Sequence, residues 1–257
     1  MEGDLQARFP GLRYRDLLAR TYTVLESRLK EQEVHSASKQ DQEGESLSQA
    51  SDSPANAFAR SIRYWPIFSD SAHALARLAN HFKLVVLSNV DNDSFGWTHP
   101  LLSLGDYYAH EMETVEDSSS SNDLYTYPIP NPNRFWHPQE KGGSKSPFTV
   151  IFTAQDVGCY KPCLQGFLTA LEYFRSQHEL FGLGCLSLDE VKEKVLCVAQ
   201  SLKHDIEPAN ELGLDAVWID RQSGVMCNEG GEGWGKWTWR FESLEALAEA
   251  VEKEVGE

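Results

Sequence analysis

Polar and charged residues follow three apolar segments of this sequence, at the point where each segment ends. In chain order they are Ser88 and Asn89, then Tyr160 and Lys161, then Ser201 and Asp205. A buried strand that ends in hydroxyl, amide or carboxylate groups often marks the rim of an active site, because open α/β sheets bind ligands beyond the carboxyl ends of their strands. Asp91 and Asp93 lie within four residues of Asn89 and are further candidates for acid–base groups.

Each of these groups also has a purely structural interpretation. Ser88 can cap a turn, Lys161 can be solvated, and Asp205 can cap the helix that follows it. Their shared position at strand ends favours a site over three unrelated structural roles. Asn92 and Tyr160 are weaker candidates for the wall of such a site.

The elements that must position these residues are short apolar strands that alternate with helices. Strands are predicted at residues 84–88, 148–154, 195–201 and 216–220. This alternation predicts an α/β fold with a parallel sheet covered on both faces. In a doubly wound sheet of that kind, the three polar strand ends would gather on one edge.

The remainder of the chain predicts helices and two low-complexity stretches. Apolar residues at helical spacing, from Leu17 to Leu29, predict a helix over residues 12–34, and Ser243 is placed to cap a last helix. Residues 35–56 are polar and rich in Ser, Gln and charge, which predicts a disordered loop. Residues 98–147 form a second low-complexity stretch, which is expected to be a decorative insertion or, through its aromatic residues, a lid.

Composition excludes several classes of partner. The 257 residues carry a net charge of −16, which argues against nucleic acid or an anionic membrane as the main partner. No run of apolar residues approaches the length of a membrane span, and no targeting segment is visible. The sequence therefore predicts a cytoplasmic protein.

The cysteine and histidine patterns give no metal signature. The five cysteines contain no CxxC pair, and their odd number favours free thiols in a reducing compartment. No HExxH spacing is present, so no metal ligand is expected. Cys159 and Cys163 flank Tyr160-Lys161-Pro162, but no histidine is near in sequence, so neither is favoured as a nucleophile.

Three stretches, in order, resemble motifs of the haloacid dehalogenase-like (HAD) hydrolase superfamily. They are SIRYWPIFSDSAHALARLANHFKLVVLSNVDNDSF, FTVIFTAQDVGCYKP and CVAQSLKHDIEPANELGLDAVWIDR. The closer similarity is to the type II (S)-2-haloacid dehalogenase branch, especially its fungal members. It covers most of residues 9–34, 57–97 and 148–257. The resemblance implies a Rossmann-like parallel sheet core at 67–257, with a helical cap region at 1–66.

The resemblance also implies a role for each candidate residue. Ser88, with Asn89, would hold a substrate carboxylate or phosphate, and Tyr160 and Ser201 would line the substrate site. Lys161 would balance the charge of a nucleophile and of the bound anion, and Asp205 would orient Lys161 or a water molecule. In a phosphatase, Asp205 would instead help to hold Mg²⁺, which is the one cofactor that the resemblance implies.

One motif of the superfamily is not found in this sequence. Its nucleophile is an Asp at the end of the first core strand, followed by a Gly-Thr pair, which attacks carbon or phosphorus and forms a covalent ester or aspartyl phosphate. Asp4 is the only aspartate among residues 1–13, and it does not follow an apolar run. Asp16 lies in a segment with the apolar spacing of a helix. The first core strand is therefore expected to be missing, which would leave its neighbours unpaired.

Three functions are compatible with these observations. The first is a HAD-type hydrolase that acts on a small organic acid or related anion, although a chain without the nucleophilic Asp is not expected to complete that reaction alone. The second is a catalytically inactive HAD-like binding or regulatory protein, or a truncated fragment. The third is a Mg²⁺-dependent small-molecule phosphatase, which the single acid Asp205 disfavours. A homodimer is an open alternative in each case.

Overall fold

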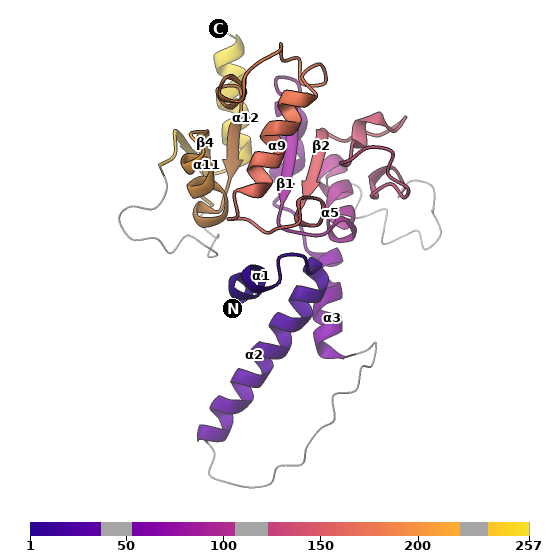
Figure 1. Cartoon of the computed structure of the whole chain (residues 1–257), viewed down its shortest axis with the longest axis vertical. Coiled ribbons are helices and arrows are strands. Elements are labelled where there is room, and N and C mark those ends of the chain that lie inside the picture. Colours follow the sequence, from indigo (N-terminus) through magenta and orange to yellow (C-terminus); the bar gives the residue numbers. More distant parts are fainter. Residues whose placement is uncertain (37–52, 106–122, 222–235, 257) are drawn as a thin grey trace.

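The computed structural model describes residues 1–36, 53–105, 123–221 and 236–256 (Figure 1). A group of helices precedes the first strand and extends away from the α/β part of the molecule. It consists of α1 (Glu2–Arg8), α2 (Tyr14–Ser36), α3 (Pro54–Arg60) and the 3-10 turn η1 (Ser61–Tyr64). We call α1, α2, α3 and η1 the N-terminal unit.

Helix α3 begins inside the segment that was expected to be a loop. The Ser53 hydroxyl accepts a hydrogen bond from the Asn56 amide at 3.3 Å, and Pro54 occupies the first turn, where a proline costs no hydrogen bond. Residues 37–52, the larger part of that predicted loop, lie outside the described residues.

The apolar stripe predicted along α2 is buried only at its start. Leu17 and Leu18 pack with Tyr14, Ala59 and Ile62 in a small core of the N-terminal unit. Leu25 and Leu29 continue the same spacing but are 45% and 51% exposed. The outer half of α2 is therefore a helix whose apolar residues face solvent within the described structure.

The rest of the described chain is an α/β fold with parallel strands, as the sequence predicted. Strands β1 (Leu84–Ser88) and β2 (Phe148–Thr153) pair in parallel. A second parallel sheet contains β3 (Leu196–Ala199), β4 (Asp215–Ile219) and the unpredicted β5 (Trp239–Phe241). The helices are α4 (Ser71–Leu78), α5 (Asn92–Leu104), α8 (Ala154–Val157), α9 (Gln165–Ser176), α10 (Leu188–Lys192), α11 (Glu207–Glu211) and α12 (Leu244–Gly256).

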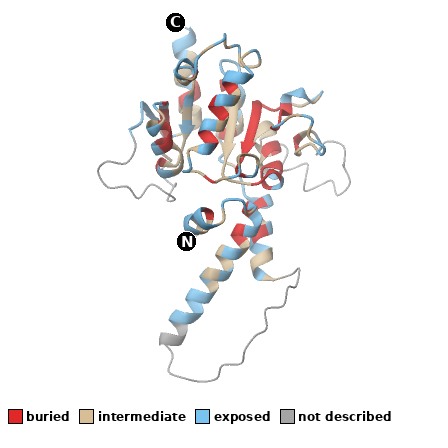
Figure 2. Ribbon diagram, in the orientation of Figure 1, coloured by how far each residue is buried: buried red, intermediate tan, exposed pale blue. Residues whose placement is uncertain are grey.

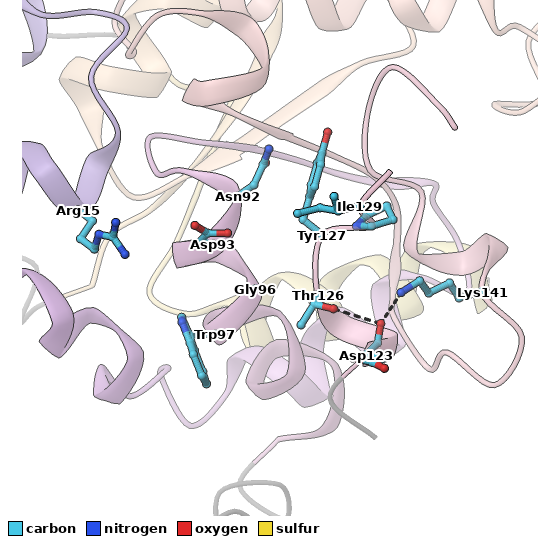
Figure 3. A pocket seen from close by; sticks show the side chains of 11 residues that line it. Arg15, Asn92, Asp93, Gly96, Trp97, Asp123, Thr126, Tyr127, Ile129 and Lys141 are labelled. Atoms are coloured by element: carbon cyan, nitrogen blue, oxygen red, sulfur yellow. Dashed lines mark hydrogen bonds between the residues drawn. The ribbon is translucent and has the colours of Figure 1, made fainter. Parts of the chain in front are cut away.

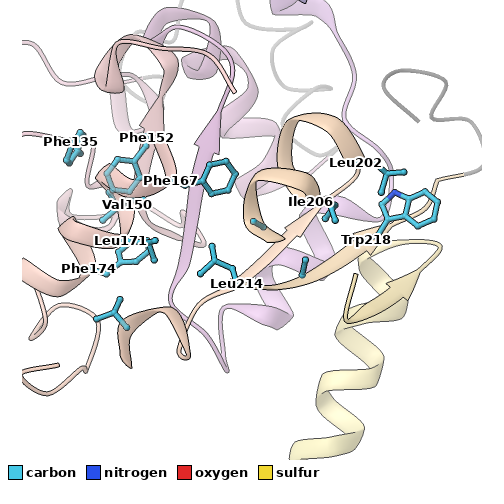
Figure 4. Packing of buried hydrophobic residues seen from close by; sticks show 14 residues of the cluster. Phe135, Val150, Phe152, Phe167, Leu171, Phe174, Leu202, Ile206, Leu214 and Trp218 are labelled. Carbon is cyan, nitrogen blue, oxygen red and sulfur yellow. The ribbon is translucent and has the colours of Figure 1, made fainter. Parts of the chain in front are cut away.

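Strand β4 shows why the sheet is covered on both faces. Ala216 and Trp218 join a large cluster with β2 and α9, while Val217 and Ile219 pack against α4 and α12. Figure 4 shows the first of these clusters, and Figure 2 shows that buried residues concentrate in the strands and on the inner sides of the helices. Because alternate side chains of one strand enter separate cores, β4 reads as a continuous apolar run.

The described strands form two sheets rather than one. Within the described residues, β1 pairs only with β2, and β3 pairs only with β4, so each has one edge without a strand partner. Strand β3 was predicted to be buried, but Leu196 and Val198 are 38% and 39% exposed, whereas Cys197 and Ala199 pack into the core. The prediction of burial is therefore wrong for one face of β3. An unpaired edge leaves the side chains beside it uncovered.

Part of the predicted insertion belongs to the core. Helix α5 extends to Leu104, and residues 106–122 lie outside the described residues. The segment 123–147, which includes the 3-10 turns η2 (Asp123–Tyr125) and η3 (Pro138–Glu140), buries Phe135 and Trp136 against β2. The decorative interpretation is wrong for this segment, because it supplies two of the largest fully buried side chains.

No helix in the described ranges combines the length and the apolar character that crossing a bilayer requires.

Candidate functional site

An ion pair joins two of the predicted site residues at the carboxyl ends of the strands. The Lys161 ammonium donates to Asp205 Oδ1 at 2.6 Å and to the Leu87 carbonyl at 2.6 Å. Their side chains are only 13% and 15% exposed. Lys161 lies in the loop after β2, Asp205 lies after β3, and Leu87 belongs to β1. The ammonium therefore connects the two sheets at one edge, as the sequence predicted for a site.

Asn89 fixes the backbone of Lys161. Its side-chain Oδ1 accepts from the Lys161 amide at 2.7 Å, and its Nδ2 donates to the Lys161 carbonyl at 3.0 Å. These two bonds hold the Lys161 peptide against the end of β1. The Asn89 amide was predicted to contact substrate, but both of its polar atoms bind Lys161 in this structure.

A short π-helical turn, η4 (Leu202–Ile206), carries Asp205. The Ser201 hydroxyl caps this turn by accepting from the His204 amide at 3.1 Å. The Ser201 carbonyl accepts from the amides of Asp205 and Ile206, each at 3.2 Å. Single π turns often occur at functional sites. Ser201 was predicted to line the substrate site, and the structure gives it the role of holding the turn that presents Asp205.

The interior beside this pair is poorly solvated. Burial raises the pKa of the Cys197 thiol to about 12, with a further increase from Asp205 that Lys161 opposes. Burial also lowers the pKa of the His204 side chain. The backbone amide of His204 donates to the Ser201 hydroxyl. Neutral forms of the Cys197 and His204 side chains are therefore favoured around neutral pH beside the Lys161–Asp205 ion pair.

Ser88 and Thr153 end the two paired strands at the same level. They are register partners in the β1–β2 ladder. Ser88 is half-buried, whereas Thr153 is fully buried and donates from its hydroxyl to Asn92 Oδ1 at 2.8 Å. Ser88 is thus the last residue of β1, at the strand end where it was predicted to lie, and the loop that leads to α5 follows it directly.

Thr153 was missed by the sequence analysis. It caps α8 with a reciprocal arrangement, in which its hydroxyl accepts from the Asp156 amide and the Asp156 carboxylate accepts from the Thr153 amide. Asn92 Nδ2 donates to Asp156 at 3.0 Å and so ties α5 to this corner. The signal was available, because a Thr followed three residues later by an acid is the pattern of a capping box.

Tyr160 contacts the N-terminal unit rather than an open site. The side chain is 5% exposed, packs among Tyr14, Leu17 and Ala154, and donates its hydroxyl to the Leu12 carbonyl at 2.6 Å. Burial, together with nearby acids, raises the pKa of this phenol well above its usual range. Tyr160 therefore anchors the helices over the carboxyl ends of the strands, which face them in Figure 1.

Asp91 makes a second connection between the two parts. Its Oδ1 accepts from the Ser94 amide at 2.7 Å and caps α5, while its Oδ2 accepts from the Arg15 amide at 3.0 Å at the start of α2. The residue is 2% exposed. Asp93, by contrast, is 63% exposed and pairs with Arg13 at 3.6 Å. Of these two candidates for acid–base groups, Asp91 therefore has a structural position and Asp93 lies at the surface.

A cavity of about 710 Å³ lies beside these contacts but not at the ion pair. Its walls include Arg15 from α2, Asp93 and Trp97 from α5, and Tyr127 and Lys141 from the segment 123–147 (Figure 3). Lys161, Asp205 and Ser88 are not among the described residues that line it. This cavity and the ion pair therefore occupy different places, and the ion pair is the stronger candidate because its groups are largely buried and held by fixed partners.

Among the described residues, no three His, Cys, Asp or Glu side chains are grouped closely enough to hold a metal ion. Asp205 directs one oxygen at the Lys161 ammonium, which is a poor arrangement for a cation ligand. The donors in the described part of the chain therefore do not fit a Mg²⁺ site at Asp205.

No protein-family model matches this chain, and no curated protein matches it. Several solved structures do. The HAD-hydrolase YfnB from Bacillus subtilis, bound to magnesium, has 14% identity and a TM-score of 0.49, covering 97% of this chain and 78% of that one. The 2-haloacid dehalogenase from Pseudomonas syringae has 17% identity and a TM-score of 0.46, covering 98% and 80%.

A HAD phosphatase from Thermococcus onnurineus has 16% identity and a TM-score of 0.40, covering 75% of this chain and 61% of that one. At these identities and TM-scores, the similarity assigns neither a family nor a substrate to this chain.

Proposed function

We propose that this chain is a HAD-type hydrolase whose site binds a small organic acid or related anion. The observation that carries the proposal is the Lys161–Asp205 ion pair at the strand edge, with Ser88 on the neighbouring strand end. A desolvated ammonium held by fixed partners attracts an anion more strongly than a solvated one, because the surroundings do not screen it.

In this proposal each residue has one task. Lys161 balances the negative charge of the substrate and of the group that attacks it, a role suited to a compact point charge. Asp205 orients the ammonium through the contact at 2.6 Å. Ser88 offers a hydroxyl to the bound anion, and Asn89 positions Lys161 through its two bonds to the Lys161 peptide.

The covalent step of such a hydrolase needs a nucleophilic carboxylate near Lys161. In the described residues, the carboxylate that pairs with Lys161 is Asp205, and its contact with the ammonium suits an orienting role. A strand placed between β1 and β3 could bring an acid to the same edge, since both strands have a free edge there. Without such an acid, the same residues support binding of an anion but no turnover, which is the second candidate function.

Halide release from (S)-2-haloacids by the purified chain is the direct test. Activity that is abolished by Lys161→Ala and by Asp205→Asn supports the hydrolase. Lys192→Ala is the matched control, because Lys192 pairs with the exposed Asp189 at 3.0 Å, away from this edge. Folded protein that binds 2-haloacids through Lys161 without releasing halide would establish the binding function instead.

A Mg²⁺-dependent phosphatase is the remaining alternative, and the donor geometry at Asp205 gives it no support. Hydrolysis of a generic phosphate ester that depends on added Mg²⁺ and is lost in Asp205→Asn would overturn this preference.

A further inference from the structure

Two cysteines bracket the loop that carries Lys161. The sequence Cys159-Tyr-Lys-Pro-Cys163 places them four residues apart. The Cys163 thiol lies near enough to Cys159 to contribute to a raised pKa of the Cys159 thiol. Cys163 is exposed and Cys159 is half-buried, so a reagent in solution reaches the Cys163 thiol directly.

The backbone between them forms a closed turn. The Cys163 amide donates to the Tyr160 carbonyl at 3.1 Å, with Lys161 and Pro162 at the corner. Tyr160 is held from outside by Leu12, and the Lys161 peptide is held by Asn89. The chain that separates the two thiols is thus fixed at Tyr160 and Lys161, and the turn brings its two ends toward each other.

We propose that Cys159 and Cys163 are an oxidation site, at which the two thiols close a disulfide across the turn that carries Lys161. The co-reactant is a small-molecule disulfide such as oxidised glutathione. The Cys163 thiolate attacks one sulfur of that disulfide and releases one glutathione thiolate. The Cys159 thiolate then attacks the Cys163 sulfur of the mixed disulfide and releases the second. Two protein thiols are oxidised, one glutathione disulfide is reduced to two thiols, and the two protons pass to the released glutathione.

Ring closure depends on ionisation of the Cys159 thiol. Burial, and then the contact with Cys163, raise the pKa of Cys159 to about 11. Only thiolates attack disulfides, so closure of the ring by Cys159 accelerates as the pH rises.

Closing the bond also changes the site. A disulfide holds its sulfurs at about 2.05 Å, which is shorter than any non-bonded contact between two thiols. The ends of the turn must therefore move together, and Lys161 lies between them. This part of the inference rests on the proposed function: oxidation is expected to reduce 2-haloacid turnover or binding several-fold, with recovery in dithiothreitol.

Peptide mapping tests the modification independently of any activity. Trypsin does not cleave between Lys161 and Pro162, so one tryptic peptide, residues 146–175, contains both cysteines. The full-length chain is incubated with increasing ratios of oxidised to reduced glutathione, alkylated, digested and analysed by mass spectrometry. The proposal expects this peptide to lose two hydrogen atoms and both alkylation sites together.

Variants make the result specific. Cys185→Ser removes an exposed cysteine from a different peptide and should leave the disulfide unchanged. Cys159→Ser and Cys163→Ser should each prevent the loss of two hydrogens. The proposal is overturned if peptide 146–175 keeps both thiols under conditions that glutathionylate Cys185, or if it is recovered only cross-linked to another peptide. Absence of turnover in the reduced protein would count against the proposed function alone, because the mass measurement still decides the disulfide.

Discussion

The side-chain amide of Asn89 forms two hydrogen bonds with the main chain of Lys161: its oxygen accepts from the Lys161 N–H, and its nitrogen donates to the Lys161 carbonyl. This pairing resembles one rung of a sheet ladder made by a side chain. It joins the end of β1 to the loop after β2, two segments that are 72 residues apart in sequence. The position of the Lys161 ammonium therefore depends on Asn89, although Asn89 does not touch it.

We expect Asn89→Asp to impair the site more than the fold. The carboxylate cannot donate to the Lys161 carbonyl and sets two acceptors against each other, at a cost of about 1–3 kcal/mol. Turnover or anion binding should fall at a temperature well below the unfolding midpoint. Asn80→Asp, which makes the same charge change at an exposed position, is the control. Equal anion affinity in both variants would refute a positioning role.

The Lys161–Asp205 pair should show strong energetic coupling. Lys161→Met leaves Asp205 as an unpaired carboxylate that is 15% exposed, and Asp205→Leu leaves the ammonium unpaired. Each single change should lower the free energy of unfolding by roughly 3 kcal/mol, and the double variant should lose much less than the sum. Urea unfolding of all four proteins gives the coupling energy. Simple additivity would show that the pair is not a unit.

Asp91 and Asp93 should differ sharply despite their proximity. Asp91→Ala removes the cap of α5 and the acceptor for the Arg15 amide, which should cost about 2–3 kcal/mol. Asp93→Ala removes an exposed ion pair and should cost less than about 0.5 kcal/mol. Hydrogen exchange at the start of α2 should increase in the first variant only. Similar exchange in both would mean that Asp91 does not hold the N-terminal unit.

His99 should make the fold sensitive to acid. It is fully buried, with Nε2 2.7 Å from the Ser146 hydroxyl and Nδ1 3.3 Å from the Tyr125 carbonyl. Burial lowers its pKa to about 4, opposed by the contact with Tyr125. The unfolded chain therefore binds the proton more readily between pH 6.5 and about pH 4, so this contribution to stability is complete above pH 6.5 and is lost as the pH falls.

The loss by pH 4 should approach about 3 kcal/mol. Urea unfolding at several pH values measures it. His99→Phe, which cannot titrate, should flatten the dependence, whereas His81→Asn, at an exposed histidine, should not change it. A dependence of unchanged steepness in His99→Phe would assign the acid sensitivity to other groups.

The strands were predictable because each is a short apolar run bounded by polar residues. Residues 84–88 match β1, and Ser243 caps α12 as expected, accepting from the Ala246 amide at 3.1 Å. Helix α1 and strand β5 were not predicted, because seven and three residues give too little periodicity. The burial of Phe135 and Trp136 was hidden by the Pro, Asn and Ser residues around them, which dominate the composition of that stretch.

For the site, the sequence predicted where residues lie on the sheet edge better than it predicted which partners their side chains contact. Lys161 and Asp205 meet as expected, since the carboxyl ends of parallel strands share an edge. The direction of a side chain is set by partners far along the chain. Tyr160 turns toward Leu12, and Asn89 turns toward Lys161. Spacing along the sequence carries no information about either choice.

The division of the strands into two sheets has a consequence for handling the protein. Within the described residues, β1 and β3 each have one unpaired edge, and the edge of β3 presents backbone donors and acceptors beside Leu196 and Val198, with no charge or proline inside the strand itself. In a concentrated solution, a strand of a neighbouring molecule can pair with such an edge. Particle size should therefore rise, and the recovery of soluble protein should fall, as the protein concentration increases. Val198→Lys should improve solubility more than any change on the acidic surface.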